Sequence, residues 1–221
     1  MLTADGGRHS SPAAAPPTIL GGVRDAANLL TLAGVISSMI AITFASTGRL
    51  AAAAVCLVAA FIFDSIDGPV AERLTGRSAN DRAIGANLDS LADVISAGVA
   101  LSVVFLAYED FGAAYVPGAL VLVAAATLRL AYFNVHGLDE QATTYTGLPT
   151  DLAIIIFVAV LLLDGPLAPH TFQVILYGVV LGLAGLMVSP LRVPKFTGAA
   201  FYTIIVLAIG LGGAHLAQAI D

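Results

Sequence analysis

Four aspartates stand close together in an otherwise apolar part of the chain: Asp64, Asp67, Asp89 and Asp93. The first pair is spaced i, i+3 and the second i, i+4, so each pair lies on one face of a helix. Their oxygen ligands suit Mg²⁺, Mn²⁺ or Ca²⁺ rather than zinc. Two such ions would clamp a diphosphate and stabilise its displacement. A carboxylate left over would take the proton from an attacking alcohol.

Two other interpretations of these acids stay open. The acids would simply solvate a loop, as many charged runs do, or they would line an ion or proton path, because acids inside a membrane also mark transporters. The phasing of both pairs within apolar helices favours a metal-dependent site.

The composition indicates an integral membrane protein. Of the 221 residues, 58% are hydrophobic and only 11% are charged, whereas soluble domains are about one quarter charged. The net charge of −6 argues against a nucleic-acid surface. Cys56, the one cysteine, has no partner for an internal disulfide.

Apolar stretches long enough to cross a bilayer recur along the chain. They predict an all-α polytopic membrane helix bundle with six to eight transmembrane helices and a best count of seven. The fifth stretch is short, so a tilted or re-entrant segment is also compatible with it. We expect helices near residues 27–47, 50–73, 84–108, 114–136, 148–164, 171–189 and 197–217.

The charges that flank these helices predict an orientation. Placing the N-terminus in the cytoplasm puts every Lys and Arg except Arg49 on the cytoplasmic side, as the positive-inside rule requires. The active site would then also face the cytoplasm. Residues 1–22, rich in Pro, Ala, Gly and Ser, are predicted to be a disordered cytoplasmic tail. Residues 23–221 would form one transmembrane domain.

The aspartates belong to a longer pattern, D-x-x-D-G-x-x-A followed by G-x-x-x-D-x-x-x-D. It begins at Asp64 and runs through Gly68 and Ala71, then resumes at Gly85 and ends at Asp93. This pattern resembles the signature of the CDP-alcohol phosphotransferase (CDP-alcohol phosphatidyltransferase) family. The resemblance implies a polytopic homodimer that holds two divalent ions, Mg²⁺ or Mn²⁺, in each site.

The resemblance also implies roles for single residues. Asp64, Asp67 and Asp89 would bind metal with help from Asp93, and Asp93 would be the general base. The predicted CDP-binding residues are Asn28, Thr31, Asp67, Gly68, Ala71, Arg73 and Gly85. Small residues leave room for a ligand against the helix backbone, although close helix packing explains them equally well.

The chain departs from the family pattern at two places. Glu72 stands where the family has arginine, and Arg73 is expected to substitute for it. The segment between Ala71 and Gly85 is about four residues longer than usual, which costs little if the addition is loop.

Further stretches are similar to membrane-embedded bacterial phosphatidylserine synthases: 28–34, 128–135, 146–150 and 186–196. They supply the predicted acceptor-binding residues, namely Arg129, Thr146, Gly147, Pro149, Arg192 and Lys195. Arginine suits a carboxylate or a phosphate, and a helix N-terminus attracts anions. Snorkelling to the interface, topology anchoring and an ordinary helix start are the structural alternatives.

The resemblance therefore implies phospholipid biosynthesis, with CDP-diacylglycerol and L-serine giving phosphatidylserine and CMP. The same chemistry with inositol phosphate or glycerol phosphate is one alternative, because several Arg and Lys residues are available for an added phosphate. A cation transporter and a catalytically silent relative are alternatives from other classes.

Overall fold

The computed structural model describes residues 25–138 and 143–220, so the predicted tail over 1–22 lies outside the described part. Most of the described chain is helical and its only strands are two of three residues each, which confirms the all-α prediction. The α-helices are α1 Ala26–Ser46, α2 Leu50–Arg73, α3 Ala79–Asp93, α4 Leu101–Ala107, α5 Val116–His136, α6 Thr150–Leu161, α7 Pro169–Met187 and α8 Ala199–Ile220. A π-helix, η2 Val94–Ala100, joins α3 to α4 into one continuous rod.

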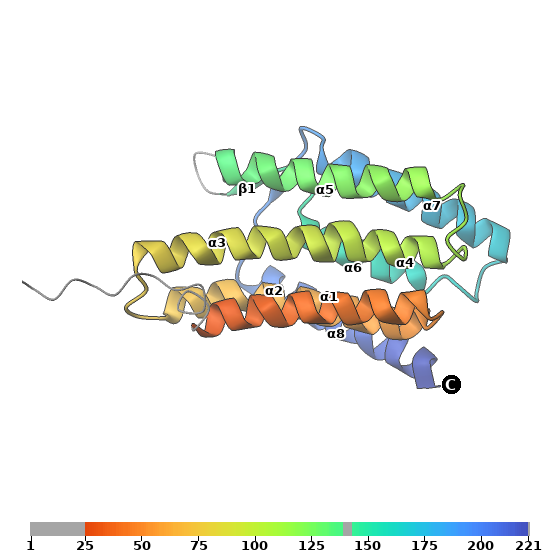
Figure 1. Cartoon of the computed structure of the whole chain (residues 1–221), viewed down its shortest axis with the longest axis horizontal. Helices are drawn as coiled ribbons and strands as arrows, with labels where there is room; N and C mark the ends of the chain where they lie inside the picture. The colour runs from red at the N-terminus through yellow and green to blue at the C-terminus, as the bar shows by residue number, and fades with distance from the viewer. Residues whose placement is uncertain (1–24, 139–142, 221) are drawn as a thin grey trace, which may run out of the picture.

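Six helices are long and apolar enough to cross a membrane, which confirms a polytopic membrane protein. The fifth predicted helix, near 148–164, corresponds to α6, which has only 12 residues. It rises about 18 Å, whereas the hydrocarbon core of a bilayer is about 30 Å thick. In Figure 1, β1 lies at the end of the bundle where α1 begins, and α6 runs toward the opposite end. The segment from β1 to α6 therefore runs along the bundle axis, partly as irregular chain and partly as a short helix.

The third helix begins earlier than the sequence predicted, at Ala79 rather than near 84. The Ser78 side chain accepts a hydrogen bond from the Asp81 backbone N–H, and Asp81 in turn accepts from the Ser78 N–H, which forms a capping box. Only residues 74–78 separate α2 from α3. The extra residues before Gly85 therefore lengthen the helices and not the loop.

Small residues let the helix backbones approach one another. A Cβ added to Gly34 in α1 would lie 3.5 Å from the carbonyl oxygen of Ala60 in α2. The Ser37 hydroxyl donates to the carbonyl oxygen of Cys56 at 2.9 Å across the same helix pair. In lipid no hydrophobic force drives helices together, so such close contacts and interhelical hydrogen bonds stabilise the bundle.

Two short strands connect the segment before α6 with the segment after α7. Thr144–Thr146 (β1) pairs antiparallel with Arg192–Pro194 (β2). Beside them, the Gly147 N–H donates to the carbonyl oxygen of Leu191 at 2.7 Å. Gly147 has a φ of 76°, and a Cβ there would collide with the carbonyl oxygen of Met187. The pairing places Lys195 near the start of α6.

Candidate functional site

Asp64 and Asp67 lie inside α2, Asp89 lies near the end of α3, and Asp93 is the last residue of α3, from which η2 continues the rod. Asp67 and Asp93 are buried, while Asp64 and Asp89 are partly buried. Carboxylate oxygens of Asp64, Asp67 and Asp89 all lie within 4.8 Å of one another. The antiparallel helices thus bring acids from two segments to one place, as the spacing predicted.

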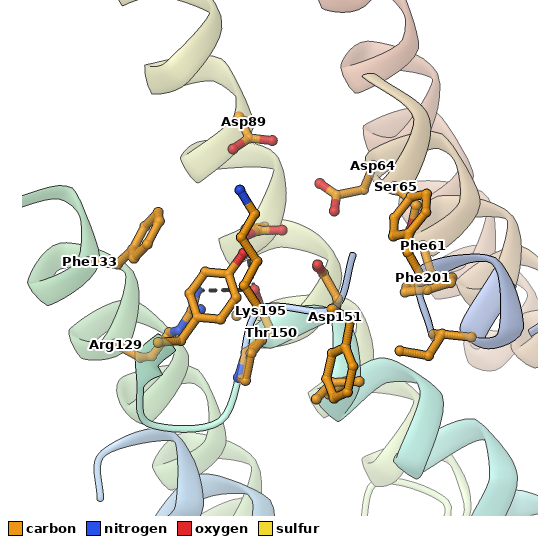
Figure 2. Close-up of a pocket in the computed structure, with 16 residues that line it drawn as sticks. Phe61, Asp64, Ser65, Asp89, Arg129, Phe133, Thr150, Asp151, Lys195 and Phe201 are labelled. Atoms are coloured by element: carbon orange, nitrogen blue, oxygen red, sulfur yellow. Dashed lines mark hydrogen bonds between the residues drawn. The ribbon is translucent and has the colours of Figure 1, made fainter. Parts of the chain in front are cut away.

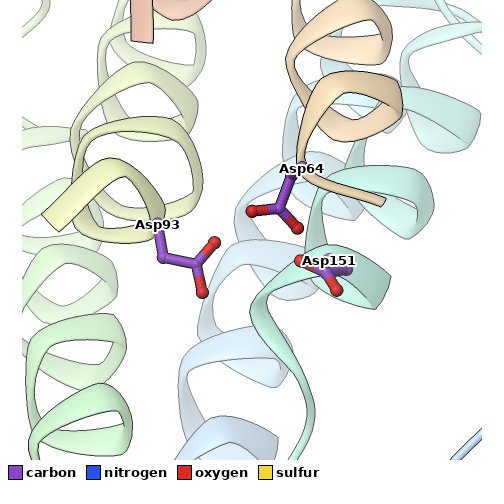
Figure 3. Close-up of side chains that lie close together, drawn as sticks. All are labelled: Asp64, Asp93 and Asp151. Atoms are coloured by element: carbon purple, nitrogen blue, oxygen red, sulfur yellow. The ribbon is translucent and has the colours of Figure 1, made fainter. Parts of the chain in front are cut away.

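A fifth aspartate, which the sequence analysis missed, completes a second group. Carboxylate oxygens of Asp64, Asp93 and Asp151 also lie within 4.8 Å of one another. Figure 3 shows Asp64 and Asp151 close together, with Asp93 facing them from another helix. Asp151 begins an apolar helix, α6, and an acid in such a segment is itself a signal of function.

This arrangement of oxygen ligands fits divalent cations. Three carboxylates within contact distance repel one another unless a cation lies between them, and hard cations prefer oxygen ligands. Asp64 belongs to both groups, so it is the carboxylate that they share. The donor set therefore supports divalent metal ions and does not distinguish Mg²⁺ from Mn²⁺.

Asp64, Asp89, Asp93 and Asp151 line a cavity of about 290 Å³, which we call the acidic cavity. Figure 2 shows the side chains around it, with the Lys195 amine pointing toward Asp89. The other residues that line it are Phe61, Ser65, Arg129, Phe133, Tyr145, Pro149, Thr150, Leu152, Lys195, Phe196, Phe201 and Ile204.

A chain of polar contacts connects Asp93 to a buried arginine in the acidic cavity. The Thr150 hydroxyl donates to the Asp93 carboxylate at 2.9 Å. An Arg129 guanidinium N–H donates to the Thr150 oxygen at 3.4 Å. Thr150 is only 1% exposed and Arg129 only 7%. Because hydroxyl and guanidinium are fixed next to it, the Asp93 carboxylate has a defined orientation.

Arg129 shares the acidic cavity with four aspartates but touches none of them directly. Its Nε atom is buried without a hydrogen-bond partner, and no carboxylate forms an ion pair with this arginine within the ranges 25–138 and 143–220. Its guanidinium lies 5.2 Å from the ring centre of Phe133 and 5.9 Å from that of Tyr145. A buried polar atom without a hydrogen-bond partner is costly, so Arg129 indicates a site for an anionic group of a ligand.

Tyr145 closes one side of the acidic cavity from β1. Burial raises the pKa of Tyr145, and the nearby Asp151 carboxylate adds to the rise. The phenol therefore stays protonated at neutral pH and is able to donate a hydrogen bond into the cavity.

A second cavity of about 230 Å³ lies on the other side of Asp89, between α1, α2 and α3. We call it the glycine-lined cavity. The Thr31 hydroxyl donates to the Asp67 carboxylate across it. Its lining residues are Ala27, Asn28, Thr31, Asp67, Gly68, Ala71, Arg77, Arg82, Gly85, Ala86 and Asp89.

The predicted CDP-binding residues therefore gather in one cavity with one exception. Arg73 is exposed in the last turn of α2 and does not line it. Arg77 and Arg82 line the cavity instead. Arg77 forms an ion pair with Asp25 at 2.9 Å and donates to the Asn28 side-chain oxygen at 3.4 Å. The family pattern expects an arginine directly after Ala71, so it gives no indication of position 77.

The predicted acceptor-binding residues are more scattered. Arg129, Pro149 and Lys195 line the acidic cavity. Thr146 lines a neighbouring cavity of about 600 Å³, which it shares with Arg129. Gly147 packs against the backbone of Met187, and Arg192 is exposed on β2.

The sequence pattern of the CDP-alcohol phosphatidyltransferase family matches residues 24–191 of the chain. The chain belongs to this family. The matched region contains the five aspartates of the two carboxylate groups and all helices from α1 to α7. It ends just before β2.

Curated CDP-alcohol phosphatidyltransferase relatives cover most of the chain. A CDP-diacylglycerol–serine O-phosphatidyltransferase of Helicobacter pylori is 34% identical over 174 residues, covering 76% of this chain and 71% of the relative. The archaetidylserine synthase of Methanothermobacter thermautotrophicus is 33% identical over 172 residues, covering 77% and 70%. A CDP-diacylglycerol–serine O-phosphatidyltransferase of Methanocaldococcus jannaschii is 31% identical over 151 residues, covering 68% and 67%.

Proposed function

We propose that this protein transfers the phosphatidyl group of CDP-diacylglycerol to the hydroxyl of L-serine, giving phosphatidylserine and CMP. One observation carries the proposal: the buried Asp93 and the unpaired Arg129 meet through Thr150 in a single cavity. An acceptor that is a hydroxy acid needs a base for its hydroxyl, here Asp93, and a cation for its carboxylate, here Arg129. The names of the relatives from Helicobacter pylori and Methanocaldococcus jannaschii support serine as this acid.

Two divalent cations, Mg²⁺ or Mn²⁺, belong to the proposed site. Asp64, Asp67 and Asp89 would bind these ions, with help from Asp93. When bound, the ions neutralise the diphosphate of the CDP-lipid and stabilise the charge that develops on it.

The glycine-lined cavity is the proposed place for the cytidine diphosphate. Gly68 has open space around its Cα, so a nucleotide can approach the backbone of α2 there. Asn28, Thr31, Ala71 and Gly85 complete its walls. Arg77 and Arg82 supply positive charge for phosphate oxygens, the role first predicted for Arg73.

The proposed reaction begins when the serine hydroxyl reaches Asp93. The Asp93 carboxylate takes the hydroxyl proton as the oxygen forms a bond to the lipid-linked phosphorus. The bond between this phosphorus and the bridging oxygen breaks, and CMP leaves with that oxygen and the bonding electrons. A positioned general base contributes about 10²- to 10⁴-fold to a rate.

The acceptor would bind in the acidic cavity next to Asp93. Arg129 holds the serine carboxylate through its planar guanidinium. Lys195, which directly follows β2, adds a second positive charge to the cavity. Pro149 and Thr150 form the start of α6, whose free N–H groups favour an anion. Thr146 lies next to Arg129 in the adjoining cavity and would limit the size of the acceptor.

The proposed orientation places this site at the cytoplasmic face. Arg73, Arg77, Arg82, Arg192 and Lys195 lie in or beside the segments that join helices at the end of the bundle where α1 begins. The positive-inside rule assigns such an end to the cytoplasm. The lipid tails would enter sideways from the bilayer. A homodimer, as the family resemblance implies, completes the proposal.

The experiment measures CMP release by the purified protein in nanodiscs that contain CDP-diacylglycerol and Mn²⁺ or Mg²⁺. Serine, inositol phosphate, glycerol phosphate and no acceptor are compared. We expect release with serine, a loss of about 10³-fold in Asp93→Asn, and no loss in Asp164→Asn, whose exposed carboxylate lies after α6. Chelation by EDTA should stop the reaction, and added Mn²⁺ should restore it.

Each acceptor gives a distinct outcome. Release with another alcohol and not with serine keeps the phosphatidyl transfer and replaces the acceptor. A folded protein that releases no CMP with any acceptor contradicts the enzymatic proposal, and ion flux through liposomes would then test the transporter alternative.

A further inference from the structure

Asp151 has no role in the reaction described above. It lies outside the signature that begins at Asp64 and ends at Asp93, and a different helix positions it. Asp151 nevertheless lines the acidic cavity and approaches Asp64 and Asp93 to within 4.8 Å. An added carboxylate at this place is costly unless a positive group lies against it.

No Lys or Arg of the described ranges forms an ion pair with Asp151, although Arg129 and Lys195 line the same cavity. Two divalent cations, when bound, would balance the four signature carboxylates and leave the charge of Asp151 over. Arg129 is the nearest fixed cation on α5, but it forms no ion pair in the described ranges and its Nε atom has no partner. In the described ranges the Asp151 carboxylate therefore has no direct cationic contact and the buried Arg129 Nε atom has no hydrogen-bond partner, so both are available to a ligand in the same cavity.

A zwitterion satisfies both groups at once. Its carboxylate would lie on Arg129 and its positive group on Asp151, and a hydroxyl between them would face Asp93. Thr150 is adjacent to Asp151 in the chain, and its hydroxyl bonds to Asp93 and accepts from Arg129. The first turn of α6 therefore fixes the relative positions of all three contacts.

We propose that Asp151 binds the ammonium group of the acceptor and thereby selects an amino acid over an acceptor without an amino group. This inference rests on the proposed transfer to serine. It also explains how a phosphorylated acceptor is rejected: the Asp151 carboxylate would lie beside a second phosphate and repel it. A site built to hydrogen-bond a polar group rejects analogues that lack the group, because its buried partner stays unpaired.

The test compares L-serine with 3-hydroxypropanoate, which keeps the hydroxyl and the carboxylate but has no amino group. CMP release is measured for the wild type, Asp151→Asn and the control Asp164→Asn in nanodiscs. We expect Asp151→Asn to lower kcat/KM for serine by about 100-fold. The value for 3-hydroxypropanoate should change by less than about threefold. The preference for serine would then largely disappear, whereas Asp164→Asn should keep it.

Binding of Mn²⁺, followed by its electron paramagnetic resonance signal, separates this role from that of a metal ligand. We expect Asp151→Asn to weaken Mn²⁺ binding by no more than about tenfold, the lower end of what a change beside metal ligands costs. Weakened Mn²⁺ binding together with an equal loss for both acceptors would overturn the proposal and make Asp151 a metal ligand.

Failure of the proposed function gives a different result. In that case the wild type itself would release no CMP with serine, before any variant is considered. If the wild type uses serine and Asp151→Asn keeps the same preference for it, only the ammonium role is wrong. Turnover of 3-hydroxypropanoate by Asp151→Asn also shows that the variant is folded and able to bind the CDP-lipid.

Discussion

The two cavities share Asp89 but are built from different parts of the chain. The glycine-lined cavity uses α1, α2 and α3, which follow one another directly in the sequence. The acidic cavity combines α2 and α3 with α5, the start of α6, and residues after β2. One cavity is thus made by neighbouring helices with a fixed motif, and the other depends on long-range packing.

The difference in lining indicates a division of tasks. Small residues and two arginines surround the glycine-lined cavity, which suits a large common ligand that approaches the backbone. Acids, one buried arginine and several aromatic rings surround the acidic cavity, which suits a small ligand selected by its charges. Changes in the two cavities should therefore affect different substrates, and each of the following variants tests this separation.

The largest expected effect concerns the acceptor side. Replacing Arg129 by Gln removes the unpaired guanidinium and should raise KM for serine by about 100-fold, because hydrogen bonds to charged groups are among the strong ones. KM for CDP-diacylglycerol should change by less than about threefold. Initial rates of CMP release at varied concentrations of each substrate measure both constants.

A matched arginine provides the control for this variant. Arg49 lies at the far end of the bundle, where its guanidinium is 4.6 Å from the ring centre of Phe44. Arg49→Gln should leave both constants unchanged. If Arg129→Gln raises both KM values equally, the two cavities do not divide the substrates as proposed.

A smaller effect is expected on the nucleotide side. A Cβ at Gly85 would lie 2.7 Å from the Arg77 Nη2 atom and 3.0 Å from the Asn28 side-chain oxygen. Gly85→Ala should displace Arg77 and raise KM for CDP-diacylglycerol by about tenfold, with KM for serine unchanged. Gly182→Ala is the control, since nothing lies within 4 Å of a Cβ there. An unaltered KM for the CDP-lipid would remove Gly85 and Arg77 from the nucleotide site.

The smallest effect is predicted for Thr31. Thr31→Val keeps the shape but removes the hydroxyl that donates to Asp67. Loss of one hydrogen bond to a carboxylate should weaken Mn²⁺ binding by about threefold to tenfold, measured by isothermal titration calorimetry. Thr43→Val, which removes a hydroxyl bonded only within α1 to Met39, should bind Mn²⁺ like the wild type. Equal affinities in both variants would show that Thr31 does not position Asp67.

Most of the fold followed from the sequence because a membrane imposes simple rules. The length and hydropathy of each apolar stretch located all seven helical segments of the described chain, with α3, η2 and α4 counted as one rod. The boundary at Ala79 was missed, because residues 79–83 are polar and only the capping box at Ser78 marks them as helical. The fifth apolar stretch is short for a membrane span, so the sequence already indicated that α6 would differ from the other helices.

The glycine-lined cavity was more predictable than the acidic one. Its residues belong to a pattern on sequential helices, and the resemblance of that pattern to the family signature predicted that they would bind one ligand. Asp151 and Thr150 reach the acidic cavity through the pairing of β1 with β2 and the packing of α6, which no local spacing encodes. Arg77 was missed because its side chain reaches back from the turn between helices, a direction that the sequence does not specify.

The π-helix η2 separates the part of the rod that carries the site aspartates from the part that packs in the membrane core. Asp89 and Asp93 precede it, while Leu101 and Phe105, both fully buried, follow it. A π-turn contains more residues than an α-turn, so the two halves point their side chains in independently set directions. A residue gained or lost in η2 would rotate one half and leave the other in register. Evolution is therefore able to adjust the membrane packing of this helix without disturbing the direction of its carboxylates.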